Sequence, residues 1–216
     1  MNKQLIKTLI NKENPIIFEI GCADGIDTQE FIDIFGENLD LHCFEPDPRN
    51  LDVFINGGER VCKPQFTGPV SGSNISLNNK AVGEIDGNCN FYQTNTIYSS
   101  SLKKPNENLT INWPSIYLQE VIEIESIKLD TYVNEKNIEI IDFIWADVQG
   151  GEDLMIKGGT EAFKKVRYLY TEYSNSESNS YYEKTPFLRD ILDLLGEGWE
   201  IHTDYGNDIL LKNKNI

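Results

Sequence analysis

A glycine-containing turn near the N-terminus carries two carboxylates. Glu19 ends an apolar run, and Gly21, Cys22, Asp24 and Gly25 follow it before a helical pattern begins. Glycines let the backbone turn sharply there and approach a ligand closely. A dinucleotide would place its pyrophosphate against bare amides at the start of the helix, where carboxylates would repel it. The acidic turn therefore suits a ligand that carries an ammonium group and a sulfonium.

A third carboxylate follows the next apolar run. Glu45 lies 24 residues after Gly21 and directly before Pro46. In nucleotide-binding α/β folds, an acid at the end of the second strand accepts hydrogen bonds from the ribose hydroxyls. The acidic turn and Glu45 together favour a cationic adenosine ligand, namely S-adenosylmethionine.

Two later apolar runs also end in acids, Asp147 and Glu172. Ligands of open α/β sheets bind outside the carboxyl ends of the strands, so both acids are expected on the same rim as Glu19 and Glu45. One of them could act as general base for a hydroxyl nucleophile. Alternatively, the pair could hold a divalent cation such as Mg²⁺ that lowers the pKa of the hydroxyl. With only two or three acids available, a metal site is not part of the prediction.

Histidines and cysteines form no recognisable site. His42 and His202 each lie inside a predicted strand, so both are interpreted as packing residues. The four cysteines show no Cys-x-x-Cys pair and no histidine at metal-site spacing. They are expected to be reduced, small apolar residues.

The elements that position these groups alternate between strands and helices, which predicts an α/β fold with a mostly parallel, doubly wound sheet. The first unit has strands at residues 15–20 and 40–45, with Asp27 as helix N-cap, Glu30 completing a capping box and Gly36 ending the helix. Further strands are predicted at residues 140–147, 166–173, 199–203 and 208–212, and helices at about residues 152–157 and from Thr185-Pro186 to Gly196. The last two strands are expected to form an antiparallel hairpin around residues 205–207.

A single domain of residues 1–216 is expected, with two additions to the alternating pattern. Residues 1–12 are predicted to form a short amphipathic helix. Residues 57–120 are rich in Asn, Ser, Gly and Pro, with strand-like pieces only at 75–82 and 89–93. This stretch is too long for a structureless loop, so it is interpreted as the third strand plus an inserted hairpin and loop layer over the active site. Residues 174–180 are a candidate mobile flap.

The net charge of −16, from 35 acidic and 19 basic residues, argues against a nucleic-acid substrate, because a phosphate backbone is bound by clustered Lys and Arg. No apolar run approaches the ~20 residues needed to cross a bilayer, and no signal-peptide pattern is present. A cytoplasmic protein without membrane contact is expected. The oligomeric state cannot be read from the sequence.

Four motifs together resemble those of the FkbM family of S-adenosylmethionine-dependent methyltransferases. They are residues 19–25, Phe44-Glu45-Pro46, Asn79-Lys80-Ala81-Val82-Gly83 and residues 147–152. The resemblance implies the seven-stranded class I methyltransferase fold, with helices on both faces and a C-terminal antiparallel hairpin strand. It also implies O-methyl transfer to a hydroxyl of a sugar or another small molecule. The residues expected to bind the cofactor are Glu19, Gly21, Cys22, Asp24, Gly25, Glu45, Pro46, Ala81, Val82 and Asp147, and those expected to act in catalysis are Asp147 and Glu172.

The fourth motif departs from the family pattern. Trp145-Ala146 stands where a lysine is common, Gln149 replaces a usual Glu, and Gly151 replaces Ala. These departures leave open a binding module that keeps the cofactor but has lost catalysis. A nucleotide-binding oxidoreductase of related fold is the other alternative. Tyr98, Trp113 and Tyr117 lie in the insertion, where they could stack on a sugar ring or simply pack the insertion onto the sheet.

Overall fold

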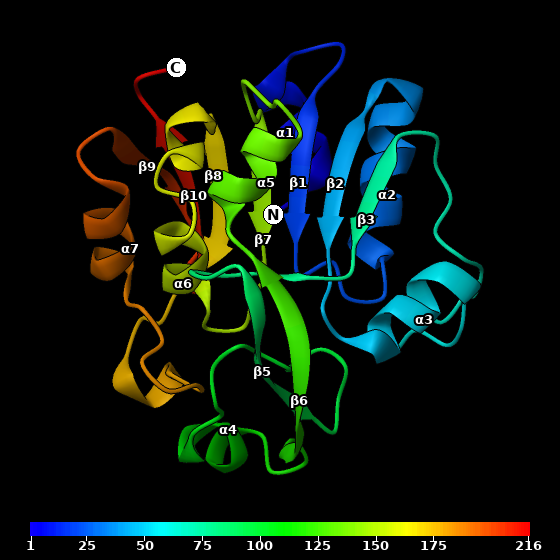
Figure 1. Ribbon diagram of the computed structural model, residues 1–216, viewed down its shortest axis with the longest axis vertical. Coiled ribbons are helices and arrows are strands. Elements are labelled where there is room, and N and C mark those ends of the chain that lie inside the picture. The colour runs from blue at the N-terminus through cyan, green and yellow to red at the C-terminus, as the bar shows by residue number, and fades with distance from the viewer.

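The computed structural model describes residues 1–216, which form a seven-stranded sheet flanked by helices (Figure 1). The strand order is β3-β2-β1-β7-β8-β10-β9. The first five strands in this order are parallel, and β10 runs antiparallel between β8 and β9. The strands are β1 (Ile16–Ile20), β2 (Asp40–Phe44), β3 (Ile75–Asn78), β7 (Phe143–Ala146), β8 (Tyr168–Glu172), β9 (Trp199–Asp204) and β10 (Asp208–Asn213). The predicted doubly wound fold with a C-terminal antiparallel hairpin is confirmed.

Helices cover both faces of the sheet and bury two separate cores. The α-helices are α1 (Lys3–Ile10), α2 (Ile26–Phe35), α3 (Pro48–Asn56), α4 (Glu107–Asn112), α5 (Leu129–Glu135), α6 (Glu152–Lys157) and α7 (Leu188–Leu195), and the 3-10 turns are η1 (Gly36–Asn38), η2 (Ala162–Lys165) and η3 (Glu177–Asn179). One core joins α1, α2 and α3 to the sheet through residues such as Ile6, Phe31 and Phe54. The other joins α5, α6 and α7 through residues such as Val133 and Met155. None of the helices is long and apolar enough to span a membrane.

A second, smaller sheet lies beyond the carboxyl ends of the parallel strands (Figure 1). It contains β4 (Ala81–Val82), β5 (Gly87–Thr94) and β6 (Leu118–Ile127) in the order β4-β6-β5. The strand predicted at residues 75–82 is therefore divided: its first half pairs with β2 and its second half with β6. The sequence analysis missed β6, although the alternation of Ile and Glu in residues 122–125 is typical of a half-exposed strand.

Two helix starts differ from the prediction. Helix α2 begins after Gly25, whose φ of 81° places the N-cap in the left-handed region, and no side chain caps it. Asp27 and Glu30 instead accept hydrogen bonds from the buried ammonium of Lys3, because α1 packs directly on this turn. Helix α7 begins at Leu188, where the Asp190 carboxylate accepts a hydrogen bond from the Phe187 amide, so Thr185-Pro186 precedes the helix rather than capping it.

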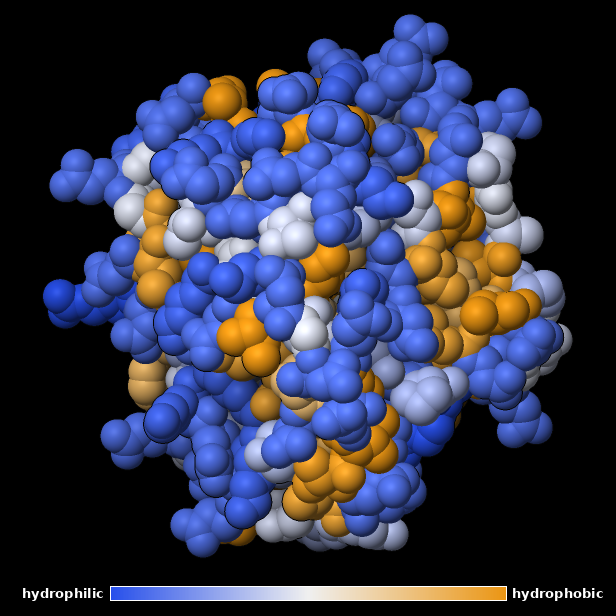
Figure 2. Space-filling view, in the orientation of Figure 1, coloured by the Kyte–Doolittle hydropathy of each residue, from blue (hydrophilic) through white to orange (hydrophobic).

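The surface is largely hydrophilic on the face drawn in Figure 2, with hydrophobic side chains gathered in two places, one over the smaller sheet and one near β3 and α3. Exposed apolar residues of the region over the smaller sheet are Ile111, Trp113, Tyr117, Leu118 and Val121. Tyr117 and Trp113 are thus about half exposed.

Candidate active site

The first turn is held against the end of β7. Gly21 has a φ of 83°, and a Cβ built on it would lie 1.9 Å from the carbonyl oxygen of Asp147. Only glycine allows this approach. Gly25 serves packing instead, because a Cβ there would meet the side chains of Val70 and Phe54 at 2.3 and 2.6 Å. The turn and the end of β7 therefore form one continuous wall.

A cavity of about 610 Å³, partly open to solvent, lies against this wall, and we call it the first cavity. Its remaining walls come from the ends of β2 and β4 and from the loop at residues 97–102. Six of the residues predicted to bind the cofactor line it, namely Gly21, Glu45, Pro46, Ala81, Val82 and Asp147. Ala81, Val82 and Phe91 give one side an apolar character that suits a planar ring.

Glu45 presents a carboxylate on the polar side of the first cavity. Its Oε2 accepts a hydrogen bond from the Ala23 amide and its Oε1 from the Asp47 amide, both at 2.8 Å. Burial raises the pKa of Glu45 to about 7 despite these bonds. Each carboxylate oxygen keeps a lone pair for a ligand. Nearby, Asn50 donates to the Ile97 carbonyl while its own buried Oδ1 has no partner.

Four residues expected at the cofactor lie behind the cavity wall: Glu19, Cys22, Asp24 and Gly25 do not line it. Glu19 is buried beneath α2, where it accepts a hydrogen bond from Thr28 Oγ1 at 2.6 Å, and burial raises its pKa to about 8. Asp24 accepts a hydrogen bond from the Tyr98 hydroxyl at 2.6 Å. Both side chains support the turn, which differs from the expectation that they face the ligand.

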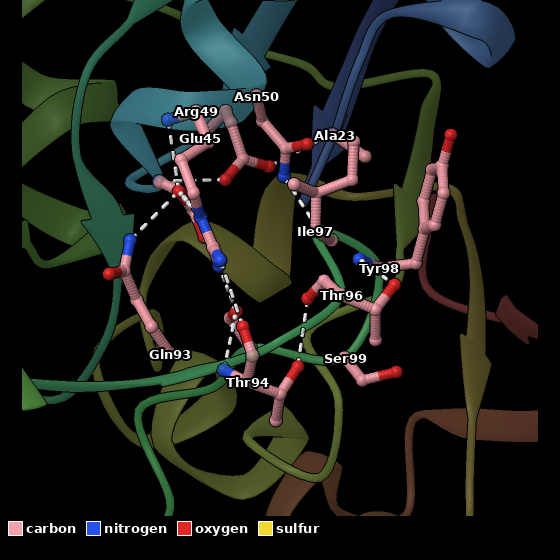
Figure 3. Close-up of polar contacts among 12 residues, drawn as sticks. Ala23, Glu45, Arg49, Asn50, Gln93, Thr94, Thr96, Ile97, Tyr98 and Ser99 are labelled. Carbon is pink, nitrogen blue, oxygen red and sulfur yellow. Dashed lines mark hydrogen bonds and ion pairs between the residues drawn. The ribbon is translucent and has the colours of Figure 1, made fainter. Parts of the chain in front are cut away.

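The smaller sheet is anchored on α3 at the rim of the first cavity (Figure 3). Arg49 donates to the Thr94 carbonyl and to the Ser100 hydroxyl, while Gln93 donates to the buried Asp47 carboxylate. Asn50 donates to the loop at Ile97. These bonds join α3 to residues 93–100, which cover the cavity, so the fold itself holds this segment in place.

A second cavity, of about 580 Å³ including open solvent, adjoins the first. Its lining includes Glu152, Glu172 and Tyr182, and Gln149 lines both cavities. The Gln149 side chain donates to Asp147 Oδ1 at 2.5 Å, and its Oε1 lies 3.1 Å from the Tyr182 hydroxyl. Gln149 and Gly150 both have left-handed backbones, with φ of 53° and 87°. This turn places Gln149 at the junction of the two cavities.

Three carboxyls at this junction influence one another. The pKa of Glu172 is raised to about 9, first by the charge of Asp147, then by burial and by Glu152 and Asp208. Burial raises the pKa of Glu152 to about 7. The Asp147 carboxyl is accessible through the cavity, yet the surrounding protein still raises its pKa to about 6, and its bond to Gln149 opposes the rise. Asp147 and Glu172, the predicted catalytic pair, are thus brought close together.

The structure shows what surrounds Trp145 and Gln149, two of the residues that depart from the family motif. Trp145 is buried, and the Lys3 ammonium lies 4.4 Å from the centroid of its ring. The N-terminal helix therefore brings an ammonium group to the strand position at which the family commonly has a lysine. Gln149 places a neutral amide among three acids, which avoids a fourth negative charge.

Neither histidine belongs to the site. His42 is buried and bonds to the Tyr132 hydroxyl at 2.8 Å, and burial lowers its pKa. His202 is exposed on the edge strand β9, which differs from the expected packing role. No three His, Cys, Asp or Glu side chains are grouped so that they could hold a metal ion.

The sequence analysis did not assign Asn50, Gln149, Glu152 or Tyr182 to the site. Glu152 was visible as the last residue of the fourth motif, and Gln149 as a departure within it. Asn50 and Tyr182 carry no sequence signal, because they reach the cavities only through the packing of α3 and of the segment before α7.

Comparison with known proteins identifies relatives along nearly the whole chain. The family model described as "Methyltransferase FkbM domain" matches residues 19–208. A 2-O-methyltransferase, NoeI, from Sinorhizobium fredii (strain NBRC 101917 / NGR234) is 32% identical over 227 residues, an alignment that covers 100% of this chain and 86% of NoeI.

Solved structures with related architecture are more distant. A putative O-methyltransferase from Klebsiella pneumoniae has 11% identity and a TM-score of 0.49, with 97% of this chain and 78% of that chain covered. Aeropyrum pernix fibrillarin, solved with natively bound S-adenosyl-L-methionine, has 14% identity and a TM-score of 0.45, with 97% and 73% covered.

Proposed function

Because the chain belongs to the FkbM family of S-adenosylmethionine-dependent methyltransferases, we propose that it methylates a hydroxyl of a small-molecule or carbohydrate acceptor. In this proposal the first cavity holds the cofactor and the second holds the acceptor. The observation that carries it is the junction at Gln149, which lines both cavities and bonds to Asp147. The 2-O-methyltransferase relative supports oxygen as the methylated atom.

The first cavity has the groups that S-adenosylmethionine requires. Glu45 can accept hydrogen bonds from both ribose hydroxyls, because each of its oxygens has a free lone pair. The unpartnered Oδ1 of Asn50 offers a further acceptor to a ligand donor. Ala81, Val82 and Phe91 suit the adenine ring. Asp147 would then lie on the side of the sulfonium.

The reaction needs alignment and removal of one proton. When bound, S-adenosylmethionine would supply an electrophilic methyl group to the acceptor oxygen, and its sulfur would keep the electron pair of the broken carbon–sulfur bond. Holding the two reactants in line can supply ~7–11 kcal/mol of the acceleration. A general base that takes the hydroxyl proton contributes ~10²–10⁴ in rate.

Asp147 is the better candidate for this base. At neutral pH its carboxyl is mostly ionised, because its pKa is about 6, whereas Glu172, with a pKa of about 9, is mostly protonated in the free protein. The Gln149 amide keeps the Asp147 carboxylate in one orientation. In its protonated form Glu172 can donate a hydrogen bond to the acceptor, so the two acids have different roles.

The proposal is tested by titrating S-adenosylhomocysteine and NAD separately into the protein in a calorimeter. We expect the first to bind and the second not to; the reverse result would favour the oxidoreductase alternative. Mass spectrometry of a panel of polyhydroxylated acceptors incubated with S-adenosylmethionine then detects the methyl ether. Cofactor binding without methylation of any acceptor would support the binding-module alternative. If a chelator abolished turnover, the reaction would require a metal ion.

A further inference from the structure

The second cavity contains more acidic side chains than the proton transfer of the proposed reaction needs. Its carboxylates are Glu152 and Glu172, with Asp147 at the junction with the first cavity. None of the eleven lining residues is Lys, Arg or His. The Lys103 ammonium lowers the pKa of Glu152, but it is already bonded to the Asp153 carboxylate at 2.5 Å and to the Lys184 carbonyl at 2.6 Å.

Unsatisfied acceptors point to a ligand in this cavity. Glu152 is only 1% exposed, and its Oε2 has no hydrogen-bond partner, while its Oε1 accepts a bond of 3.2 Å from the Gly150 amide. A buried carboxylate oxygen without a partner is costly, because it has lost water and gained nothing in return. No hydrogen bond or ion pair to another side chain satisfies Glu172, the neighbouring acid on the cavity wall. A ligand that brings donors to both oxygens would remove this cost.

The charges can be counted across the two cavities. The sulfonium of the cofactor offsets one of the three carboxylates, and Asp147 is placed for that role. Glu152 and Glu172 remain to face the acceptor. In the free protein a proton on Glu172, whose pKa is about 9, relieves the repulsion. A neutral acceptor would leave this proton in place, whereas an ammonium group would bring the positive charge that lets both carboxyls ionise. An anionic acceptor such as a uronate or a phosphate ester would add to the repulsion.

We infer that the acceptor is a hydroxylated amine, with its ammonium group bound between Glu152 and Glu172 and its hydroxyl directed to Asp147. An amino sugar is the carbohydrate form of such a molecule. Tyr173 and Tyr181 also line this cavity, and tyrosine rings can bind an ammonium group by cation–π contact as well as stack on a sugar ring. This inference depends on the proposed function, because it assigns the acceptor of the same reaction.

The test compares two acceptors of nearly the same shape but different charge: the methyl glycoside of a 2-amino-2-deoxy sugar and the same glycoside with a hydroxyl group in place of the amine. Both are titrated into protein saturated with S-adenosylhomocysteine, at a pH below the pKa of the amine, and both are assayed with S-adenosylmethionine. We expect the amine to bind at least ~10-fold more tightly, which corresponds to ~1.4 kcal/mol, and to be the better substrate. Equal binding, preference for the neutral sugar, or binding of neither would overturn the inference.

Variants separate this inference from the proposed function. Glu152→Gln should reduce the preference for the amine, because the affinity for the amine should fall more than that for the neutral sugar, while the affinity for S-adenosylhomocysteine stays unchanged. Glu183→Gln is the matched control, because Glu183 is exposed and outside the cavity. If S-adenosylhomocysteine does not bind the wild-type protein, the proposed function itself fails. If it binds and the neutral sugar is methylated equally well, only the acceptor assignment fails. Loss of the amine preference on addition of Mg²⁺ would mean that the carboxylates bind a metal ion, which also overturns it.

Discussion

The two adjoining cavities have similar size but opposite chemistry. The first combines an apolar side with Glu45, whose carboxylate already accepts two backbone hydrogen bonds. The second contains Glu152, whose buried Oε2 has no hydrogen-bond partner, and Glu172, which accepts no hydrogen bond from another side chain. The unpartnered polar atom of the first cavity is the neutral amide oxygen of Asn50, so this cavity can bind an uncharged adenosine without leaving a charge unsatisfied. A site with unsatisfied charge is less stable when empty and gains more from its ligand, so the difference separates cofactor binding from acceptor binding.

The largest effect is expected at the junction, where Asp147 serves both cavities. In Asp147→Asn the carboxamide cannot take the hydroxyl proton, so kcat should fall by ~10²–10⁴, the range of general-base contributions. The affinity for S-adenosylhomocysteine, measured by calorimetry, should change little, because this ligand carries no sulfonium charge. Asp193→Asn, on the exposed side of α7, is the control. An unchanged kcat in Asp147→Asn would show that Asp147 is not the general base.

The next effect concerns the wall behind the first cavity. Gly21→Ala should destabilise the protein because the new Cβ would overlap the Asp147 carbonyl. Gly36→Ala is a matched control, since Gly36 has a similar φ of 75° but no atom within 4 Å of the position that a Cβ would take. The difference in unfolding free energy between the two variants, from urea denaturation, should be ~1–3 kcal/mol, the usual cost of overpacking. If both variants lost the same unfolding free energy, backbone strain alone would explain the destabilisation by Gly21→Ala.

The raised pKa of Glu172, in the second cavity, predicts how the stability of the protein depends on pH. The pKa of Glu172 in the folded protein, about 9, lies above its ordinary value, so the folded state binds this proton more tightly than the unfolded state. The resulting stabilisation is complete below the ordinary pKa of a glutamate and is lost as the pH rises through about 9.

Glu172→Gln stays neutral at every pH, so its melting temperature should rise relative to that of the wild type between pH 5 and pH 9. Glu183→Gln, exposed and outside the cavity, should follow the wild-type curve. Parallel curves for wild type and Glu172→Gln would show that the charge of Asp147 does not act on this residue as proposed.

The smallest effect is expected at the cover of the first cavity. The Tyr98 hydroxyl donates to Asp24 and ties the inserted loop to the first turn. Tyr98→Phe removes one hydrogen bond to a carboxylate, worth ~1.5–3 kcal/mol at most, and should weaken S-adenosylhomocysteine binding only several-fold, since the other anchors of the loop remain. Tyr117→Phe, at an exposed position, should bind like the wild type. If Tyr98→Phe weakened S-adenosylhomocysteine binding as much as Glu45→Gln does, the supporting role of Tyr98 would be contradicted.

Sequence reasoning predicted the first cavity much better than the second. The ends of β1, β2 and β7 follow short apolar runs and carry motif residues, so Gly21, Glu45 and Asp147 could be placed on one rim. Glu19 does not line the first cavity, because side chains alternate between the faces of a strand and its face is covered by Thr28 of α2. Nothing in a local pattern reveals which face a neighbouring helix will cover.

The second cavity depends on contacts between distant segments. Tyr182 reaches Gln149 and Ser99 from the segment before α7, and Glu152 lies at the start of α6. Its unpartnered oxygen is a property of packing, which residue types and spacing cannot show. The pairing of β4 with β6 was missed for the same reason, because the two strands are separated by more than thirty residues.

The division of roles between the cavities is tested most directly by titrating S-adenosylhomocysteine into Glu45→Gln and Glu172→Gln, after each variant has been shown to melt cooperatively. The account predicts that Glu45→Gln weakens binding by ~10–100-fold, the equivalent of ~1.5–3 kcal/mol for hydrogen bonds to a charged group, and that Glu172→Gln leaves the Kd unchanged. Weakening of equal size in both variants, or in Glu172→Gln alone, would contradict the assignment of the first cavity to the cofactor and the second to the acceptor.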